Sequence, residues 1–125
     1  MRYIPTLAIV FLITLVADGV RAGEFDFGDV DFPVFTGQIV RGDAKRLGLR
    51  YHGKEDRPSA LVVNSSGGDV YEAMAIGRFL RSHESQVILP VGARCLSACV
   101  LIMAGAVNRA VLGQVGVHRP YGTGV

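Results

Sequence analysis

The sequence predicts an α/β domain in which crossover helices connect the strands of a mostly parallel sheet. Segments of strand composition alternate with segments of helical periodicity, in the order strand, helix, strand, helix, strand, helix, strand, strand. The run ALVV at residues 60–63 is short and entirely apolar, which is typical of a parallel strand buried on both faces. This pattern favours a layered fold with right-handed crossovers, in which functional groups gather where strands end and helices begin.

The composition indicates a single globular domain. The chain has 125 residues, of which 50% are hydrophobic, and its formal net charge is +2. These values are typical of a folded chain and not of a disordered one. The sequence contains no basic stripe and no interleaving of aromatic with basic residues, so we expect no nucleic-acid partner.

Residues 1–22 are predicted to be a secretory signal peptide. A positive start is followed by an apolar run at 4–17, which is short for a bilayer span of roughly 20 residues. Small residues at Val20 and Ala22 suit a signal peptidase, so we expect cleavage after Ala22 and a periplasmic or secreted protein. The alternative is an uncleaved amino-terminal anchor, which would be the chain's only contact with a membrane.

The mature chain is expected to begin with an extended arm, residues 23–34, followed by the domain at 35–125. Residues 34–40 have strand composition. Asp43 can cap the helix that follows, because apolar residues then recur at helical spacing: Ala44, Leu47 and Tyr51.

The remaining elements follow the strand at 60–63. A polar turn, NSSGG at 64–68, leads into a helix that Ser66 or Asp69 can cap and that runs to about Ser82. Strands are expected at 86–91, 108–112 and 115–117, with a turn at 92–95. The apolar run at 97–106 predicts a helix buried on all sides.

The two cysteines, Cys95 and Cys99, lie on either side of Ser97. In an oxidising compartment a lone pair is more often a disulfide than a metal site, and two thiolates cannot complete a zinc shell. A disulfide needs α-carbons within about 7 Å, which a turn entering a helix can provide. Two buried, reduced cysteines are the alternative. We predict no metal site and no cofactor.

Ser97 and His118 are candidate reactive residues, each with a structural alternative. Ser97 is expected at a strand-to-helix junction, where it is either a helix cap or a nucleophile that needs a base. His118 ends an apolar strand and is either a structural residue or that base, whereas His52 and His83 are expected at the surface.

Gly67 and Gly68 have two interpretations. They either supply the positive φ that a turn requires, or they expose backbone N–H groups to a ligand, as an oxyanion hole does. A phosphate-binding loop is disfavoured, because no Gly-Lys-Ser/Thr ending follows and Asp69 would repel an anion.

Three segments together resemble a known family. LVVNSSGGDVYEAMAIGRFL is similar to the N-S-P-G-G-x-V segment and following helix of the Clp protease proteolytic subunit and its wider ClpP/crotonase superfamily. VGARCLSACVLIMAGAVNR resembles that family's G-x-A-x-S-x-x segment, and VGVHRP resembles its I-H-Q-P segment. The segments come in the order of the family and with nearly its spacing. The secretory signal and Cys-x-Ser-x-Cys setting resemble secreted or periplasmic ClpP-like proteins.

The resemblance implies a ClpP/crotonase-like fold and a role for each matched residue. Ser97 would be the nucleophile and His118 the general base. Gly68, with Gly67 beside it, and Ala98 would supply the N–H groups of the oxyanion hole. The substrate would be a peptide or protein segment lying extended beside the Gly-Gly turn, and a homo-oligomer would be in keeping with the family.

The sequence departs from the family pattern at two places. Ser66 replaces the usual proline of the turn, and no carboxylate follows His118, where the family has its third catalytic residue. We therefore expect either a fragment of a longer protein or a catalytically poor protein, and the Gly-rich end at 121–125 favours the fragment. Apolar surface should then be exposed along the helix at 97–106.

The predicted function is that of a secreted or periplasmic ClpP-like serine hydrolase, specifically a peptidase. The main alternative is a non-catalytic member of the fold that binds peptides or partners in the same groove. An acyl-CoA enzyme of the crotonase type fits a secreted protein poorly. A Ser-Lys peptidase would need a base lysine, and the two lysines, Lys45 and Lys54, lie in no matching segment.

Overall fold

A computed structural model describes residues 21–53 and 55–117. The predicted signal peptide therefore lies outside the described residues except for its last two, and so does His118. The described chain forms a five-stranded sheet in the order β1-β2-β3-β4-β6. Its strands are β1 (Glu24–Asp26), β2 (Val34–Thr36), β3 (Ala60–Asn64), β4 (Gln86–Leu89) and β6 (Arg109–Val111).

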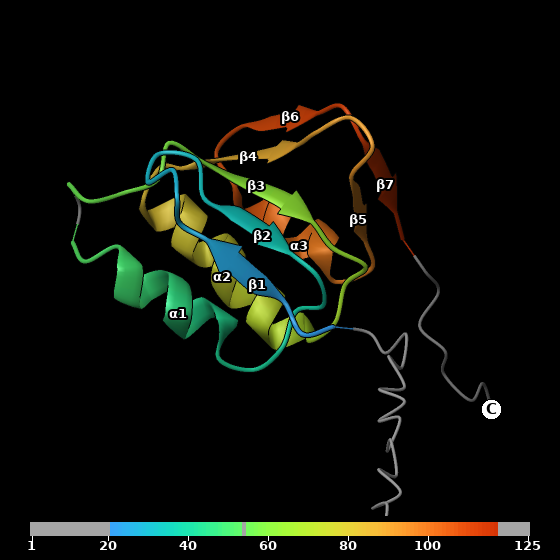
Figure 1. The fold of residues 1–125 in the computed structure, drawn as a ribbon, viewed down its shortest axis with the longest axis horizontal. Coiled ribbons are helices and arrows are strands. Elements are labelled where there is room, and N and C mark those ends of the chain that lie inside the picture. The colour runs from blue at the N-terminus through green and yellow to red at the C-terminus, as the bar shows by residue number, and fades with distance from the viewer. Residues whose placement is uncertain (1–20, 54, 118–125) are drawn as a thin grey trace, which may run out of the picture.

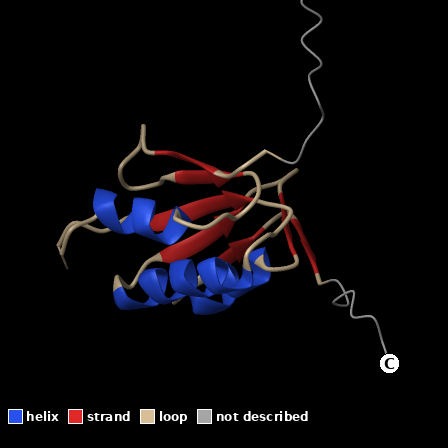
Figure 2. Cartoon of the chain, turned by 90° about the horizontal axis from the view of Figure 1, so that it is seen from below, coloured by secondary structure: helices blue, strands red, loops and turns tan. Residues whose placement is uncertain are grey.

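The sheet confirms the predicted parallel α/β architecture. Every pair of neighbours from β2 to β6 is parallel, and only β1 is antiparallel to its partner. The crossover helices are α1 (Asp43–Arg50), α2 (Val70–Ser82) and α3 (Cys99–Gly105). Because successive strands are added in one direction, right-handed crossovers put all three helices on one face of the sheet, as Figure 2 shows.

A second, smaller sheet lies beyond the carboxyl ends of β3, β4 and β6 (Figure 1). It pairs β5 (Arg94–Leu96) with β7 (Gln114–Gly116) in parallel. The sequence predicted a turn at 92–95, and this was wrong for its last two residues, because Arg94 and Cys95 take extended partners in β7. A bridge between Ser65 and Cys95 joins the small sheet to the end of β3.

The core lies between the main sheet and the helices. Leu61 and Val63 of β3 are fully buried, as expected of a central parallel strand, and they pack in one cluster with Ile76 and Leu80 of α2. Where α2 crosses α3, a side chain on Gly105 would strike the backbone of Gly77. Glycine at both positions therefore lets the two helices approach more closely than larger residues would allow.

The predicted exposure of the helix at 97–106 is wrong in its location. α3 is shorter than that range, and its Ile102 and Met103 are buried because α2 covers it. The exposed large apolar side chains after residue 90 lie instead on and around β6 and β7. They are Val91, Val111, Leu112, Val115 and Val117.

Two features of the amino-terminal half differ from expectation. The arm at 23–34 is not merely extended, since part of it forms β1 along the edge of β2. Asp43 does not cap α1; Gly42, at φ +98°, is the cap residue and Asp43 is the first residue of the helix. The buried Asp43 carboxylate instead accepts a hydrogen bond from the Val40 N–H (2.7 Å) and pairs with Arg46.

Candidate active site

The Gly-Gly turn connects the carboxyl end of β3 to α2 and is held in place from two directions. The Ser65 hydroxyl, which is buried, accepts a hydrogen bond from the Gly67 N–H at 3.1 Å. On the other side, the Ile39 N–H donates to the Gly67 carbonyl at 2.8 Å and the Ile39 carbonyl accepts from the Asp69 N–H at 2.9 Å. Asp69, one of the two predicted caps, does cap α2 by accepting from the Glu72 N–H at 2.8 Å.

Both glycines of the turn are required by its geometry. Gly67 and Gly68 have φ values of +107° and +139°, which L-residues rarely adopt. A Cβ on Gly67 would lie 2.8 Å from the Leu96 carbonyl oxygen and 2.9 Å from the Ser97 Cβ. A Cβ on Gly68 would strike the Ile39 carbonyl oxygen. The turn thus touches the backbone that carries Ser97, and no side chain could stand between them.

Ser97 lies in a sharp turn between β5 and α3. Its φ is +54°, which is unfavourable for an L-residue, and its N–H donates to the Gly116 carbonyl of β7 at 2.8 Å. The structure contradicts the interpretation of Ser97 as a helix cap, because α3 begins at Cys99 and its cap residue is Ala98. Ser97 is exposed although both of its neighbours along the chain are partly or fully buried.

Two backbone N–H groups have no acceptor among the described residues, one in the Gly-Gly turn and one in the residue that follows Ser97. They belong to Gly68 and Ala98, two of the three positions predicted to form an oxyanion hole; the N–H of the third, Gly67, donates to the Ser65 hydroxyl. The Ala98 nitrogen lies 3.2 Å from the point that a Cβ on Gly67 would occupy. The turn, the exposed serine and an unpaired N–H therefore meet at one place on the surface.

The Cys95–Cys99 pair, predicted as a possible disulfide, brackets this place. The two sulfur atoms lie at bonding distance, with the α-carbons 5.2 Å apart. Both cysteines are fully buried.

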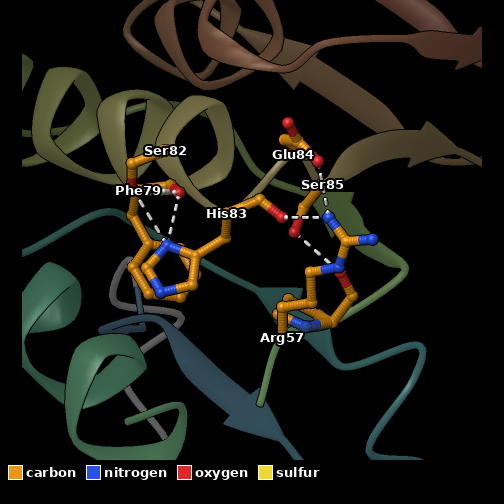
Figure 3. Close-up of polar contacts among 7 residues, drawn as sticks. Arg57, Phe79, Ser82, His83, Glu84 and Ser85 are labelled. Atoms are coloured by element: carbon orange, nitrogen blue, oxygen red, sulfur yellow. Dashed lines mark hydrogen bonds and ion pairs between the residues drawn. The ribbon is translucent and has the colours of Figure 1, made fainter. Parts of the chain in front are cut away.

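The two described histidines lie far from Ser97. His52 and His83 line a surface cavity of about 510 Å³ next to the carboxyl end of α2, together with Tyr51 and Phe79. Figure 3 shows His83 stacked against Phe79, with its Nδ1 2.9 Å from the Phe79 carbonyl oxygen. The Gly-Gly turn is at the opposite end of α2, which has 13 residues and is therefore about 20 Å long. Neither histidine can reach Ser97.

Ser65 is a supporting residue that the sequence analysis missed. Besides its side-chain bond to Gly67, its N–H donates to the Arg94 carbonyl (2.7 Å) and its carbonyl accepts from the Leu96 N–H (3.0 Å). It therefore binds the Gly-Gly turn and the Ser97 segment together. A serine two residues before a glycine at the end of a buried strand is the signal of such a side-chain-to-backbone turn.

Neither a metal site nor a membrane-spanning helix is found in the described part of the chain. No three histidine, cysteine, aspartate or glutamate side chains in residues 21–53 and 55–117 are grouped to hold a metal ion. No helix within these ranges is both long enough and apolar enough to cross a bilayer.

Comparison with known proteins gives one family match. The family model for Clp protease matches residues 44–124, a range that contains the Gly-Gly turn and Ser97. Among solved structures, the chain is similar to a probable enoyl-CoA hydratase/isomerase from Mycobacterium abscessus, with 11% identity and a TM-score of 0.48. That match covers 71% of this chain and 45% of the other, so the chain spans less than half of that structure's length. A comparison with curated proteins finds no match.

Proposed function

The chain belongs to the Clp protease family, and from this premise we propose that it is a serine peptidase with Ser97 as nucleophile and His118 as general base. The observation that carries the proposal is the position of Ser97. Its exposed side chain stands at a left-handed turn against Gly67, and the N–H groups of Ala98, the next residue, and of Gly68, the residue after Gly67, have no acceptor among the described residues. A nucleophile needs this combination of access and nearby hydrogen-bond donors.

In the proposed reaction, the Ser97 Oγ attacks the carbonyl carbon of a peptide bond while His118 accepts the hydroxyl proton. The carbonyl oxygen becomes an oxyanion, which the N–H groups of Gly68 and Ala98 stabilise. His118 then returns the proton to the leaving amine. In the second half of the reaction, water attacks the acyl-enzyme, His118 accepts its proton, and the Ser97 hydroxyl is released. Removal of one donor from such a site typically costs about 10²–10³-fold in rate, so the N–H groups of Gly68 and Ala98 would each matter to catalysis.

The proposal of His118 as the base is supported by the resemblance of VGVHRP to the family's histidine segment and by the positions of the two described histidines. His52 and His83 lie at the far end of α2. The carbonyl of Gly116 accepts a hydrogen bond from the N–H of Ser97 itself. In the sequence, His118 follows Gly116 by two residues.

The substrate is proposed to be an extended peptide or protein segment that lies beside the Gly-Gly turn. Gly68 is exposed there and carries no side chain, so its backbone is open to a peptide. The proposed location is the periplasm or the cell exterior. It is supported by the signal-like sequence at 1–22 and by the cysteine pair at bonding distance, which suits an oxidising compartment.

The test is covalent labelling of the full-length protein with a fluorophosphonate probe, which phosphonylates activated serines. We expect the wild type to be labelled, Ser97→Ala to be unlabelled and His118→Ala to be labelled at least tenfold more slowly. Ser59→Ala is the matched control, because Ser59 is exposed at the opposite end of β3 and should label as the wild type does. Equal labelling of wild type and Ser97→Ala would place the reactive serine elsewhere and overturn the assignment, whereas no labelling of either would favour a non-catalytic, peptide-binding role.

A further inference from the structure

The two buried cysteines enclose the proposed nucleophile within a short covalent loop. Cys95 is the central residue of β5 and Cys99 is the first residue of α3, with Ser97 midway between them. The sulfur atoms are at bonding distance and have no exposed surface, whereas Ser97 is exposed. A disulfide here would mainly restrain the backbone of Ser97, because Ser97 is the central residue of the loop that the bond closes.

The elements at the two ends of the loop are held without such a bond. β5 is paired with β7 along its whole length and is hydrogen-bonded to Ser65, and α3 packs along α2 through the contact between Gly77 and Gly105. Cross-linking a loop this short also removes less unfolded-state entropy than cross-linking a long one. Global stability therefore gives little reason for a disulfide at this place.

The backbone conformation of Ser97 does give a reason for a disulfide at this place. A serine at φ +54° is strained, and such a residue keeps its conformation only where its surroundings impose it. Among the described residues, the backbone contacts that restrain Ser97 are its hydrogen bond to Gly116 and the bond from the Val100 N–H to its carbonyl (3.1 Å). A covalent closure across Ser97 would prevent the turn from relaxing and carrying the hydroxyl away from Gly67.

We propose that a Cys95–Cys99 disulfide is a positioning element that holds Ser97 in its reactive backbone conformation, so that reduction of the bond lowers the reactivity of Ser97 while the domain stays folded. This inference rests on the proposed function of Ser97. Forming the bond transfers two electrons and two protons from the thiols to a disulfide oxidant, which leaves as two thiols. A dithiol reverses the exchange and becomes a cyclic disulfide.

The experiment compares the oxidised full-length protein with the double variant Cys95→Ala/Cys99→Ala. One readout is the rate of fluorophosphonate labelling; the other, which needs no activity, is amide hydrogen exchange of the peptide covering residues 94–101. We expect labelling to slow at least tenfold, since small misplacements of a reacting group have large effects on rate. Exchange should accelerate in residues 97–100 and stay unchanged in α1 and α2.

A matched control separates positioning from general loss of stability. Tyr51→Phe removes the hydrogen bond from the Tyr51 hydroxyl to the Val30 carbonyl (2.7 Å) at the other end of the molecule. It should lower the melting temperature and leave the labelling rate of Ser97 unchanged. A cooperative thermal transition of the cysteine variant above the labelling temperature would show that the variant is folded during labelling. Its slower labelling could then not be attributed to unfolding.

The outcomes distinguish the two proposals. Labelling through Ser97 at equal rates in wild type and double variant, with unchanged exchange, overturns the positioning role and leaves the peptidase proposal standing. Local exchange differences without any labelling of the wild type overturn the peptidase proposal and leave the backbone role standing. An oxidised protein whose intact mass still includes both thiol hydrogens overturns the disulfide itself.

Discussion

A methyl group added to Gly67 should damage both the stability of the domain and the geometry at Ser97. In Gly67→Ala the new Cβ would lie 2.8 Å from the Leu96 carbonyl oxygen, 2.9 Å from the Ser97 Cβ and 3.2 Å from the Ala98 nitrogen. Two of these atoms belong to the backbone, which cannot rotate away as a flexible side chain can. The Ser97 segment would therefore have to shift.

The expected loss has two parts. An alanine at positive φ costs about 1–2 kcal/mol of folding free energy. Forcing a methyl into a fully packed place costs about 1–3 kcal/mol more. Gly67→Ala should therefore destabilise the domain by about 2–5 kcal/mol. The control is Gly92→Ala, because Gly92 also has positive φ (+81°) but has nothing within 4 Å of its Cβ position, so only the first part applies.

Thermal unfolding followed by circular dichroism measures the difference. Each kcal/mol lowers the melting temperature of a domain of this size by about 4–8 °C, so Gly67→Ala should melt at least about 4 °C below Gly92→Ala. Fluorophosphonate labelling of Ser97 should fall in Gly67→Ala and stay near the wild-type rate in Gly92→Ala. Equal melting temperatures for the two variants would refute the close contact between the Gly-Gly turn and the Ser97 segment.

Three further predictions concern the rest of the fold. Gly105→Ala should destabilise the domain, because its methyl would strike the backbone of α2; Gly48→Ala, in an uncrowded place on α1, should stabilise it by about 0.5–1 kcal/mol in urea unfolding. Asp69→Ala should lower the free energy of unfolding by about 0.5–2 kcal/mol, because the cap of α2 is lost. Ser66→Ala should change it by less than about 0.5 kcal/mol. A larger loss in Ser66→Ala than in Asp69→Ala would make Ser66 the cap. Burial raises the pKa of Tyr51, so the stabilisation by its protonated phenol is complete below about pH 10 and is lost as pH rises through the raised value. As pH rises above about 10, the free energy of unfolding should fall less in Tyr51→Phe than in the wild type. An identical fall in both proteins would show that Tyr51 is not the group responsible.

Local patterns in the sequence were enough to predict most of the elements. The apolar run at 60–63 became β3, and the apolar periodicity after Asp69 became α2, which ends at Ser82 as expected. Prediction failed where a tertiary contact overrode the local pattern. Ser97 was expected to begin a helix. Its N–H instead donates to the Gly116 carbonyl and its backbone is left-handed, so α3 begins only at Cys99.

The burial of apolar residues was predicted less well. Periodicity identifies apolar segments but does not say which neighbour covers them. One side of α3 was expected to be uncovered in a fragment, yet the crossing of α3 with α2 at Gly77 and Gly105 buries Ile102 and Met103, and exposed apolar residues lie around β6 and β7. The prediction for Asp43 was also wrong. Gly42, with its positive φ, is the cap residue of α1, so Asp43 is the first residue of the helix and not its cap.

The sequence by itself determined the alternation of strands and helices, the two interpretations of the glycines at 67 and 68, and the resemblance to the ClpP/crotonase superfamily. These depend on interactions between residues close in the chain, such as apolar periodicity and turn chemistry. Only the tertiary structure decided that Ser65 ties the Gly-Gly turn to β5, that Ser97 stands against Gly67, and that His52 and His83 lie at the far end of α2. The physical reason is that these relations arise from sheet pairing and close packing between segments distant in sequence, which no local pattern specifies.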